Sequence, residues 1–425
     1  MAGLEALPLD AIVLADVALV LVAGAVMVRL ARRLRQPPVV AEITVGVMLG
    51  PSLLGLLPGN LTEVIFPPQA RPVLGIVAQI GLVLFMFLAG WELDLRRLRS
   101  RGTALGTMAM AAMAVPFVLG LGAAAVIYGA LGSGGTDRTA FMLFLATAFS
   151  ITAFPVLARI IKDRGLASTR VGALALTCAA IGDVTAWCVL VLVVALAGSG
   201  GVLDFVTVVA LTAVFGAVMG LVVRPLLASV LRKVSGPTQW VLISAGVFLT
   251  SVATTWIGIH AIFGAFAFGL VMPRHGPQWQ TVSAPMERTT ALLLPVYFVV
   301  TGLAVDINGL GAAGLSVLAL VVAVAVIGKF AGASLPARLW GMPWREACAF
   351  GALMNTRGLT EIVILGIGHD LGLIGPELFT VMVLMALITT AMAGPVLHKL
   401  GMDQAGPPHP PPVRPARDEE PVLSR

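Results

Sequence analysis

The sequence predicts an all-α polytopic membrane protein with about thirteen transmembrane helices. Composition, the recurrence of long apolar segments and the placement of basic residues all point to this class. Of 425 residues, 58% are hydrophobic and 11% are charged, whereas a soluble domain carries about 25% charged residues. So little charge cannot cover a globule of this length in water, which excludes an ordinary soluble enzyme. The hydrophobic content also excludes a disordered or collagen-like chain, despite 47 Gly and 27 Pro.

The apolar segments are long enough to cross a bilayer, which takes about 20 mostly apolar residues. Hydropathy alone would allow the eighth and ninth of these segments to merge at Trp256-Ile257-Gly258. The predicted spans are 11–30, 38–57, 72–91, 103–131, 139–161, 170–198, 204–230, 238–257, 259–272, 289–304, 310–337, 345–370 and 376–398.

The basic residues decide the number of spans, because cytoplasmic loops concentrate Lys and Arg. With thirteen spans, 23 of the 27 basic residues fall on one side, and only Arg71 and Arg138 fall on the other. Merging 238–257 with 259–272 would break this alternation for every later loop. The sequence therefore predicts a multi-pass protein of the cell membrane, with the N-terminus outside and the C-terminus cytoplasmic.

Residues outside the spans carry no recognisable catalytic or nucleotide-binding motif. Residues 401–425 form a short Pro-rich cytoplasmic tail. The basic residues sit in short clusters between apolar segments, so no nucleic-acid partner is expected. We expect neither enzymatic activity nor a bound cofactor.

Ionisable residues inside spans are the first functional signal. Each costs at least about 2.5–3.5 kcal/mol at the bilayer centre, and such residues usually mark ion pathways or proton relays. Asp183 is the deepest acid, and Lys329 lies deep in 310–337. Their alternative role is a structural brace between helices. The full set is Asp16, Glu42, Asp183, Lys329, Arg357 and Glu361.

Two spans are predicted to be broken near their middle. The span 139–161 contains Pro155, which removes a backbone donor and clashes with the preceding turn; 345–370 contains the polar run 354–361. Carbonyls freed by a break need hydroxyl groups or a cation as partners. The two spans lie seven apart and so cross in opposite senses, as in inverted repeats with an ion site at the midplane.

Several stretches resemble the monovalent cation:proton antiporter-2 family, in particular the branch with plant cation/H⁺ exchangers. Residues 149–159, which include Ser150, Thr152 and Pro155, resemble the fifth-helix signature of that family. Further resemblance lies, in chain order, at Glu42-Ile43 through Gly50-Pro51-Ser52, at Asp183-Val184-Thr185-Ala186-Trp187, at Gly302-Leu303, at Gly328-Lys329 and at 354–361.

The resemblance implies the inverted-repeat antiporter fold with two crossed discontinuous helices. Residues 1–400 would form one exchanger-like transmembrane domain with interleaved dimerisation and ion-translocating parts, acting as a homodimer. Asp183 would be the essential carboxylate and Lys329 the basic residue of the core. Family members often carry Asn or Asp where this chain has Gly182, which leaves the partner of Lys329 open.

The hypothesis is that Asp183 binds either a proton or a monovalent cation, Na⁺ or K⁺, but never both. Burial favours the neutral carboxyl and a nearby cation favours the charged one, so the two ligands compete. With one evident carboxylate, we expect electroneutral one-for-one exchange by alternating access. Thr152 and Ser150 are expected either to add oxygen ligands or to satisfy freed carbonyls.

The remaining polar residues of the second break are assigned structural roles. Asn355 and Thr356 are expected to cap half-helices, and Arg357 and Glu361 to form an i,i+4 pair within the bundle. Two other functions remain open on the same fold. A proton- or sodium-coupled symporter for a small solute would need a larger polar cavity, and an uncoupled cation efflux pathway would tolerate the loss of Asp183.

Overall fold

The computed structural model describes residues 8–34, 36–92, 103–131, 137–166, 169–198, 202–234, 236–273 and 278–402, and these ranges contain helices but no β-strand. The elements are α1 (Leu9–Arg33), α2 (Pro38–Leu49), the 3₁₀ turn η1 (Leu54–Leu56), α3 (Leu61–Ile65), α4 (Arg71–Glu92), α6 (Thr103–Leu131), α7 (Arg138–Ser150), α8 (Phe154–Asp163), α9 (Arg170–Gly198), α10 (Val202–Val218), the π turn η3 (Met219–Val223), α11 (Arg224–Lys233), α12 (Pro237–Ile257), α13 (Ala261–Val271), α14 (Gln278–Leu303), α15 (Ala312–Leu339), α16 (Trp344–Met354), α17 (Leu359–Asp370) and α18 (Pro376–Lys399).

The predicted all-α membrane fold is confirmed. Every predicted span falls on one helix or on consecutive helical elements; the span 204–230 covers α10, η3 and α11. Within the described ranges, nine helical segments are long and apolar enough to cross a membrane, and α7 and α13 are shorter apolar helices. Thirteen as the number of crossings stays a prediction. Of the predicted tail 401–425, the described residues include only Gly401 and Met402.

Some predicted boundaries differ from the helices. The span 38–57 holds a helix only to Leu49, because Gly50 takes an extended conformation and the following Pro51 has no backbone N–H to continue the ladder. The span 289–304 belongs to a longer helix that begins at Gln278. The chain turns between α12 and α13 at Gly258, whose φ of 99° suits glycine, so these two segments are separate helices.

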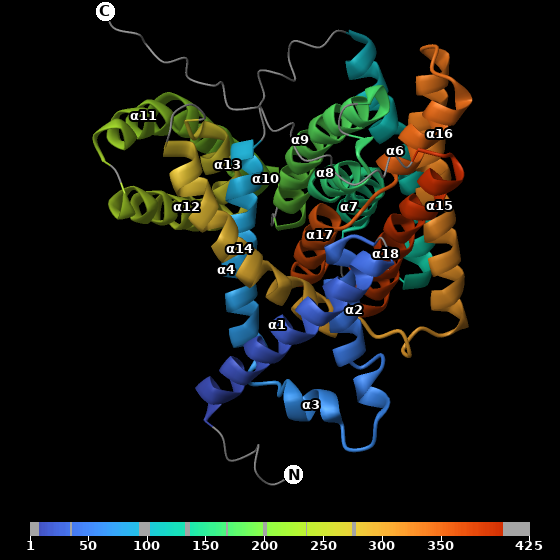
Figure 1. The fold of residues 1–425 in the computed structure, drawn as a ribbon, viewed down its shortest axis with the longest axis horizontal. Coiled ribbons are helices and arrows are strands. Elements are labelled where there is room, and N and C mark those ends of the chain that lie inside the picture. Colours follow the sequence, from blue (N-terminus) through green and yellow to red (C-terminus); the bar gives the residue numbers. More distant parts are fainter. Residues whose placement is uncertain are drawn as a thin grey trace, which may run out of the picture.

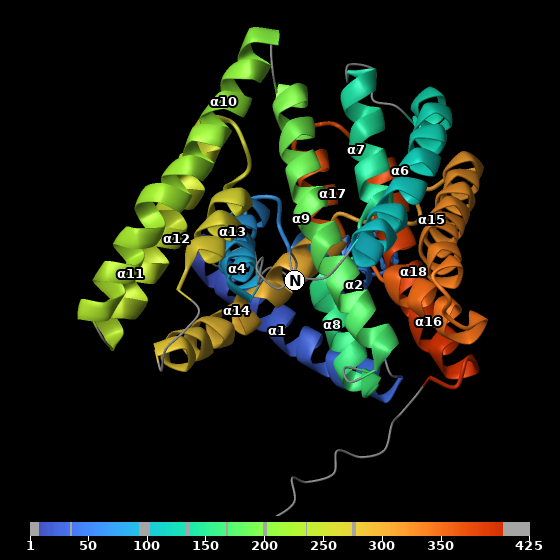
Figure 2. The same ribbon diagram turned by 90° about the horizontal axis from the view of Figure 1, so that it is seen from above.

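The helices form two groups that lie side by side (Figures 1 and 2). One group contains α1, α4 and α10 to α14, and the other contains α6 to α9 and α15 to α18. Helix α2 packs against α14 of the first group and also touches α18 of the second. In Figure 2 the segment α10–α11 runs along the outer edge of the first group, with little of its surface buried.

Close packing in the first group depends on glycines. A Cβ at Gly269 of α13 would lie 2.2 Å from the carbonyl oxygen of Phe87 in α4, and one at Gly90 would lie 2.2 Å from that of Phe266. Both distances are far inside van der Waals contact. Helices in a membrane associate through such small residues, which let two backbones approach. Helices α4 and α13 are therefore held face to face by positions that tolerate no side chain.

Replacing Gly269 by Ala should destabilise the protein by about 1–3 kcal/mol, because overpacking forces the two backbones apart. Gly216→Ala in α10 is the matched control, since nothing lies within 4 Å of a Cβ there. Thermal unfolding of both variants in detergent, followed by light scattering, checks the difference. Equal stability of Gly269→Ala and Gly216→Ala would show that the α4–α13 contact is looser than described.

Candidate functional site

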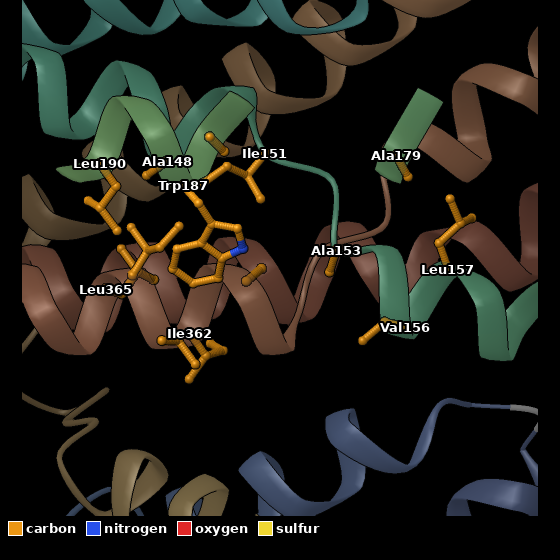
Figure 3. Close-up of a cluster of buried hydrophobic side chains, with 14 of the residues drawn as sticks. Ala148, Ile151, Ala153, Val156, Leu157, Ala179, Trp187, Leu190, Ile362 and Leu365 are labelled. Atoms are coloured by element: carbon orange, nitrogen blue, oxygen red, sulfur yellow. The ribbon is translucent and has the colours of Figure 1, made fainter. Parts of the chain in front are cut away.

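Two interrupted helices cross at the centre of the second group. Helix α7 ends at Ser150, the chain is extended at Ile151, and α8 begins at Phe154. Pro155 occupies the first turn of α8, where its missing N–H costs no helical hydrogen bond. Figure 3 shows Ile151 and Ala153 on this link, beside the helix that carries Ile362 and Leu365.

The second interruption separates α16, which ends at Met354, from α17, which begins at Leu359. Gly358 precedes α17 with a φ of 146°, a conformation that a residue with a Cβ rarely adopts. Figure 2 shows that α7–α8 and α16–α17 run in opposite directions. This antiparallel crossing is the arrangement that the two polar breaks predict.

Each break satisfies backbone groups of the other. The N–H of Ala153 donates to the carbonyl oxygen of Thr356 at 3.1 Å, and the hydroxyl of Thr152 donates to the carbonyl oxygen of Met354 at 2.7 Å. Freed backbone groups in a membrane must find such partners inside the protein. At the crossing, each interrupted helix therefore supplies hydrogen-bond partners for groups at the break of the other.

Two basic side chains occupy the C-terminal end of α7. Arg357 donates from Nη1 to the carbonyl of Ala148 at 2.8 Å and from Nη2 to that of Phe149 at 2.7 Å. Lys329 donates from Nζ to the carbonyl of Ser150. These carbonyls form the negative end of the helix dipole, where cations are stabilised. Three consecutive carbonyls that α7 leaves open are thus all bound.

Arg357 also pairs with Glu361 across one helical turn. Their Nη1 and Oε1 atoms lie 2.9 Å apart, and both side chains are fully buried. The backbone of Arg357 is held from α18, where the hydroxyl of Thr390 accepts from its N–H at 2.8 Å and donates to its carbonyl at 2.7 Å. Thr390 is not among the predicted site residues. Its signal is the pair Thr389-Thr390 within a mostly apolar stretch of the span 376–398.

Lys329, fully buried in α15, has only neutral acceptors. Besides Ser150, it donates to the hydroxyl of Thr152 at 2.8 Å and to the carbonyl of Ala112 in α6 at 3.3 Å. In the described part of the chain it forms no ion pair with Asp183. The structure does not form a direct Asp183–Lys329 pair within the described residues, because α6, α7 and the link after α7 supply the acceptors of the ammonium group.

Asp183 belongs to α9 and lies beside the first residue of α8. Its Oδ2 accepts from the N–H of Phe154 at 3.3 Å, at the positive end of that half-helix, where a carboxylate is stabilised. Its Oδ1 is buried and has no hydrogen-bond partner among the described atoms. Buried polar atoms are nearly always paired, and exceptions need an explanation. A carboxylate oxygen is thus open beside the crossing.

The position before Asp183 has unused room. A Cβ at Gly182 would meet the sulfur of Met113 at 3.6 Å, an ordinary van der Waals contact. The missing second polar residue therefore leaves a small space towards α6 and no strain. Lys329, whose partner the sequence leaves open, donates to two backbone carbonyls and to the hydroxyl of Thr152.

The hydroxyl groups at the breaks bond largely within their own turns. Ser150 donates to the carbonyl of Thr147 and Thr356 to that of Leu353, each at 2.8 Å. Asn355 is buried at the end of α16, and its Oδ1 has no partner among the described atoms. Thr152 bridges Lys329 and α16. Whether Ser150 or Thr152 also contributes a cation ligand stays a prediction.

Two further acids lie outside the crossing. The side chain of Asp16 in α1 is only 3% exposed, because α1 packs on α2 and α14. Glu42 of α2 is partly buried. Neither belongs to a metal-binding cluster, since the described residues bring no three His, Cys, Asp or Glu side chains together.

Two oppositely directed broken helices around a buried carboxylate define this chain as a membrane transport protein. The comparisons with known proteins identify its family. The model of the family described as sodium/hydrogen exchanger, transmembrane, matches residues 17–402. The chain belongs to the sodium/hydrogen exchanger family, whose members are multi-pass transporters and not enzymes.

Individual relatives cover nearly the whole chain. The Na⁺/H⁺ antiporter NhaS4 of Synechocystis is 38% identical over 397 residues, which make up 92% of this chain and 97% of the relative. Cation/H⁺ antiporter 20 of Arabidopsis thaliana is 40% identical over 91% of this chain. K⁺/H⁺ antiporter 1 of Saccharomyces cerevisiae is 33% identical over 85% of it. This chain spans only 48% and 43% of these last two relatives.

A solved structure shares the fold. The sodium proton antiporter MjNhaP1 of Methanocaldococcus jannaschii superposes with a TM-score of 0.64 over 93% of this chain and 98% of its own, at 15% identity. The expected antiporter fold is thereby confirmed.

Removing the carboxylate of Glu361 should destabilise the protein by about 3–5 kcal/mol, because Glu361→Ala leaves the guanidinium of Arg357 buried without its counter-ion. Glu287→Ala on α14, where the side chain is exposed, is the control and should unfold like the unmodified protein. Melting temperatures in detergent report both. Coincident melting curves would mean that the ion pair contributes nothing to the crossing.

Proposed function

We propose that this chain exchanges a monovalent cation, Na⁺ or K⁺, for protons, and that the two compete for Asp183. The observation that carries this proposal is the buried Oδ1 of Asp183, which has no hydrogen-bond partner among the described residues, while Oδ2 accepts from the N-terminus of α8. A protonated carboxyl needs no ligand there, whereas an ionised one attracts a cation. The names of the relatives, which are Na⁺/H⁺, K⁺/H⁺ and cation/H⁺ antiporters, support this function.

The surrounding charges favour competition at one group. Arg357 and Lys329 are fixed on the carbonyl oxygens of α7, and Glu361 is paired with Arg357. Asp183 is therefore the charged group at the crossing that retains an open acceptor among the described atoms. A single exchangeable carboxylate supports one proton for one cation, and hence electroneutral exchange.

Thr152 is the proposed second oxygen ligand. Its hydroxyl donates to Met354 and accepts from Lys329, and a hydroxyl oxygen has two acceptor lone pairs. One lone pair therefore remains for a hard cation, which prefers oxygen ligands. Lys329 then fixes the orientation of the Thr152 hydroxyl and does not bind the carboxylate of Asp183.

The two helix groups suggest how the site changes sides. Helix α2 connects them through α14 and α18, and few other helices pack across the boundary. Rocking of the group with the broken helices against the other would expose Asp183 alternately to each face. We further propose a homodimer in the cell membrane with its N-terminus outside and its C-terminus cytoplasmic.

Replacing Asp183 by Asn should abolish cation-driven proton movement, because the amide cannot exchange a proton near neutral pH. Fluorescence dequenching in everted vesicles measures the activity. Asp204→Asn, the same change at an exposed residue of α10, is the matched control and should keep full activity. Transport that persists without Asp183 would favour an uncoupled efflux pathway.

The same assay with Na⁺, K⁺, Li⁺ and Rb⁺ across pH identifies the cation. Electroneutral exchange should proceed at the same rate when valinomycin and K⁺ clamp the membrane potential at zero or at a negative value, for a cation other than K⁺. A rate that follows the potential would contradict the one-for-one ratio. A response to none of the four cations would favour a solute symporter.

A further inference from the structure

A tyrosine hydroxyl joins the two helix groups close to the second helix break. Tyr297 of α14 donates from Oη to the carbonyl oxygen of Ile362 in α17, at 3.3 Å. Helix α14 belongs to the first group and α17 to the second. No other hydrogen bond joins these two helices in the part of the chain that the structure describes. The phenol of Tyr297 therefore crosses the boundary along which the two groups would move.

The hydroxyl can reach the backbone of α17 because Gly366 has no side chain. A Cβ at Gly366 would lie 3.1 Å from Oη of Tyr297, tighter than an ordinary van der Waals contact. Ile362 is fully buried and directly follows Glu361, whose carboxylate binds Arg357. Tyr297 thus holds the half-helix that carries the ion pair of the crossing.

The bond can break without leaving the carbonyl of Ile362 unpaired. In an α-helix this carbonyl also accepts from the N–H four residues later, and a carbonyl oxygen has two lone pairs. The separation of 3.3 Å exceeds the roughly 2.5–3.0 Å of most O–H···O bonds. The contact with Tyr297 is therefore a weak second bond, added to an intact helix.

The hydroxyl of Tyr297 also has a replacement partner nearby. Tyr297 lines a cavity of about 270 Å³ between α4, α14, α17 and α18. Gln79 and Thr301 contribute polar groups to the same lining, and a water molecule takes up about 30 Å³ in the liquid. Water in this cavity can accept from Oη once the bond to Ile362 is broken.

We propose that Tyr297 is a positioning residue for the exchange: it holds α17 on α14 in the observed state and releases it when the helix groups rock. This role rests on the proposed alternating access of Asp183. An ionised, empty Asp183 opposes movement through the apolar boundary, because a buried charge without a partner is costly. A proton or a cation removes that cost. The Tyr297–Ile362 bond should therefore persist while Asp183 is empty and break in a fraction of the molecules once Asp183 is occupied.

The two tyrosines of the chain, Tyr128 and Tyr297, can be observed separately. Protein grown with meta-fluorotyrosine in a Tyr128→Phe background gives a single fluorine NMR signal, that of Tyr297. Tyr297→Phe protein labelled at Tyr128 is the matched control, because Tyr128 lies near the end of α6, beside Arg138. Both proteins are measured in detergent, in alkaline buffer, with and without saturating Na⁺ or K⁺.

Without Na⁺ or K⁺, Tyr297 should give one signal, that of the bonded ring. Saturating cation should add a second signal from the released ring, with about a tenth of the intensity, as for a minor conformation populated by a ligand. In Asp183→Asn the site is neutral throughout, so both signals should be present and cation should leave their ratio unchanged. The signal of Tyr128 should not respond.

Removing the hydroxyl should speed the exchange, because the bond no longer has to break. At saturating cation, vesicles with Tyr297→Phe should exchange about two- to fivefold faster than the parent, the range that one weak neutral hydrogen bond provides. Proton release per chain in detergent should stay the same, because Tyr297 binds neither ion. Tyr128→Phe should exchange like the parent. A rate of Tyr297→Phe at or below that of the parent would contradict the proposed role.

The two measurements separate this role from the proposed function. Exchange by the parent, together with a Tyr297 signal that no cation changes, would overturn the role of Tyr297 and leave the proposed function standing. Absence of exchange by the parent with Na⁺, K⁺, Li⁺ and Rb⁺ would instead overturn the proposed function.

Discussion

The contacts of Arg357 hold the two broken helices together. Its guanidinium joins the end of α7 to Glu361 of α17, and its backbone is fixed by Thr390 of α18. A fully buried charge is tolerated in a membrane protein only when neighbouring groups replace water. Here carbonyl oxygens and a carboxylate do so, although Nε remains unpaired among the described atoms. The geometry of the site follows from this one anchor.

Around Arg357, each charged side chain lies near the half-helix end whose dipole has the opposite sign. Positive side chains bind the C-terminal end of α7, and the carboxylate of Asp183, which has an open oxygen among the described atoms, lies beside the N-terminal end of α8. Each group is stabilised by the dipole it faces. Because the ammonium group of Lys329 is bonded to carbonyl oxygens of α7 and α6, its charge acts on Asp183 without a direct hydrogen bond between the two side chains. This separation leaves Asp183 available for an exchangeable ion.

Much of this site could be predicted from the sequence. Pro155 and the polar run 354–361 indicate breaks, and their separation indicates opposite directions. The depth of Asp183 and Lys329 marks both as unusual. The acceptors of Lys329 could not be predicted, because they include backbone carbonyls 179 and 217 positions away in the chain. Every residue has a carbonyl group, so the sequence does not indicate which carbonyls are left free.

The fold, like the site, could be predicted from the sequence only in part. Long apolar segments predict the helices, whereas the early end of α2 and the long start of α14 depend on Gly50 and on polar residues beyond the apolar stretch. The bond between Tyr297 and Ile362 joins residues 65 positions apart in the chain, so only the assembled helices show it.

The central claim is that a proton and a cation displace each other at Asp183. The most direct measurement is proton release from purified protein in weakly buffered detergent solution, followed with a pH indicator as Na⁺ or K⁺ is added near pH 7. The account predicts saturable release approaching one proton per chain at the pH where Asp183 is protonated, and none from Asp183→Asn. Cation binding without proton release, or equal release from Asp183→Asn, would contradict it.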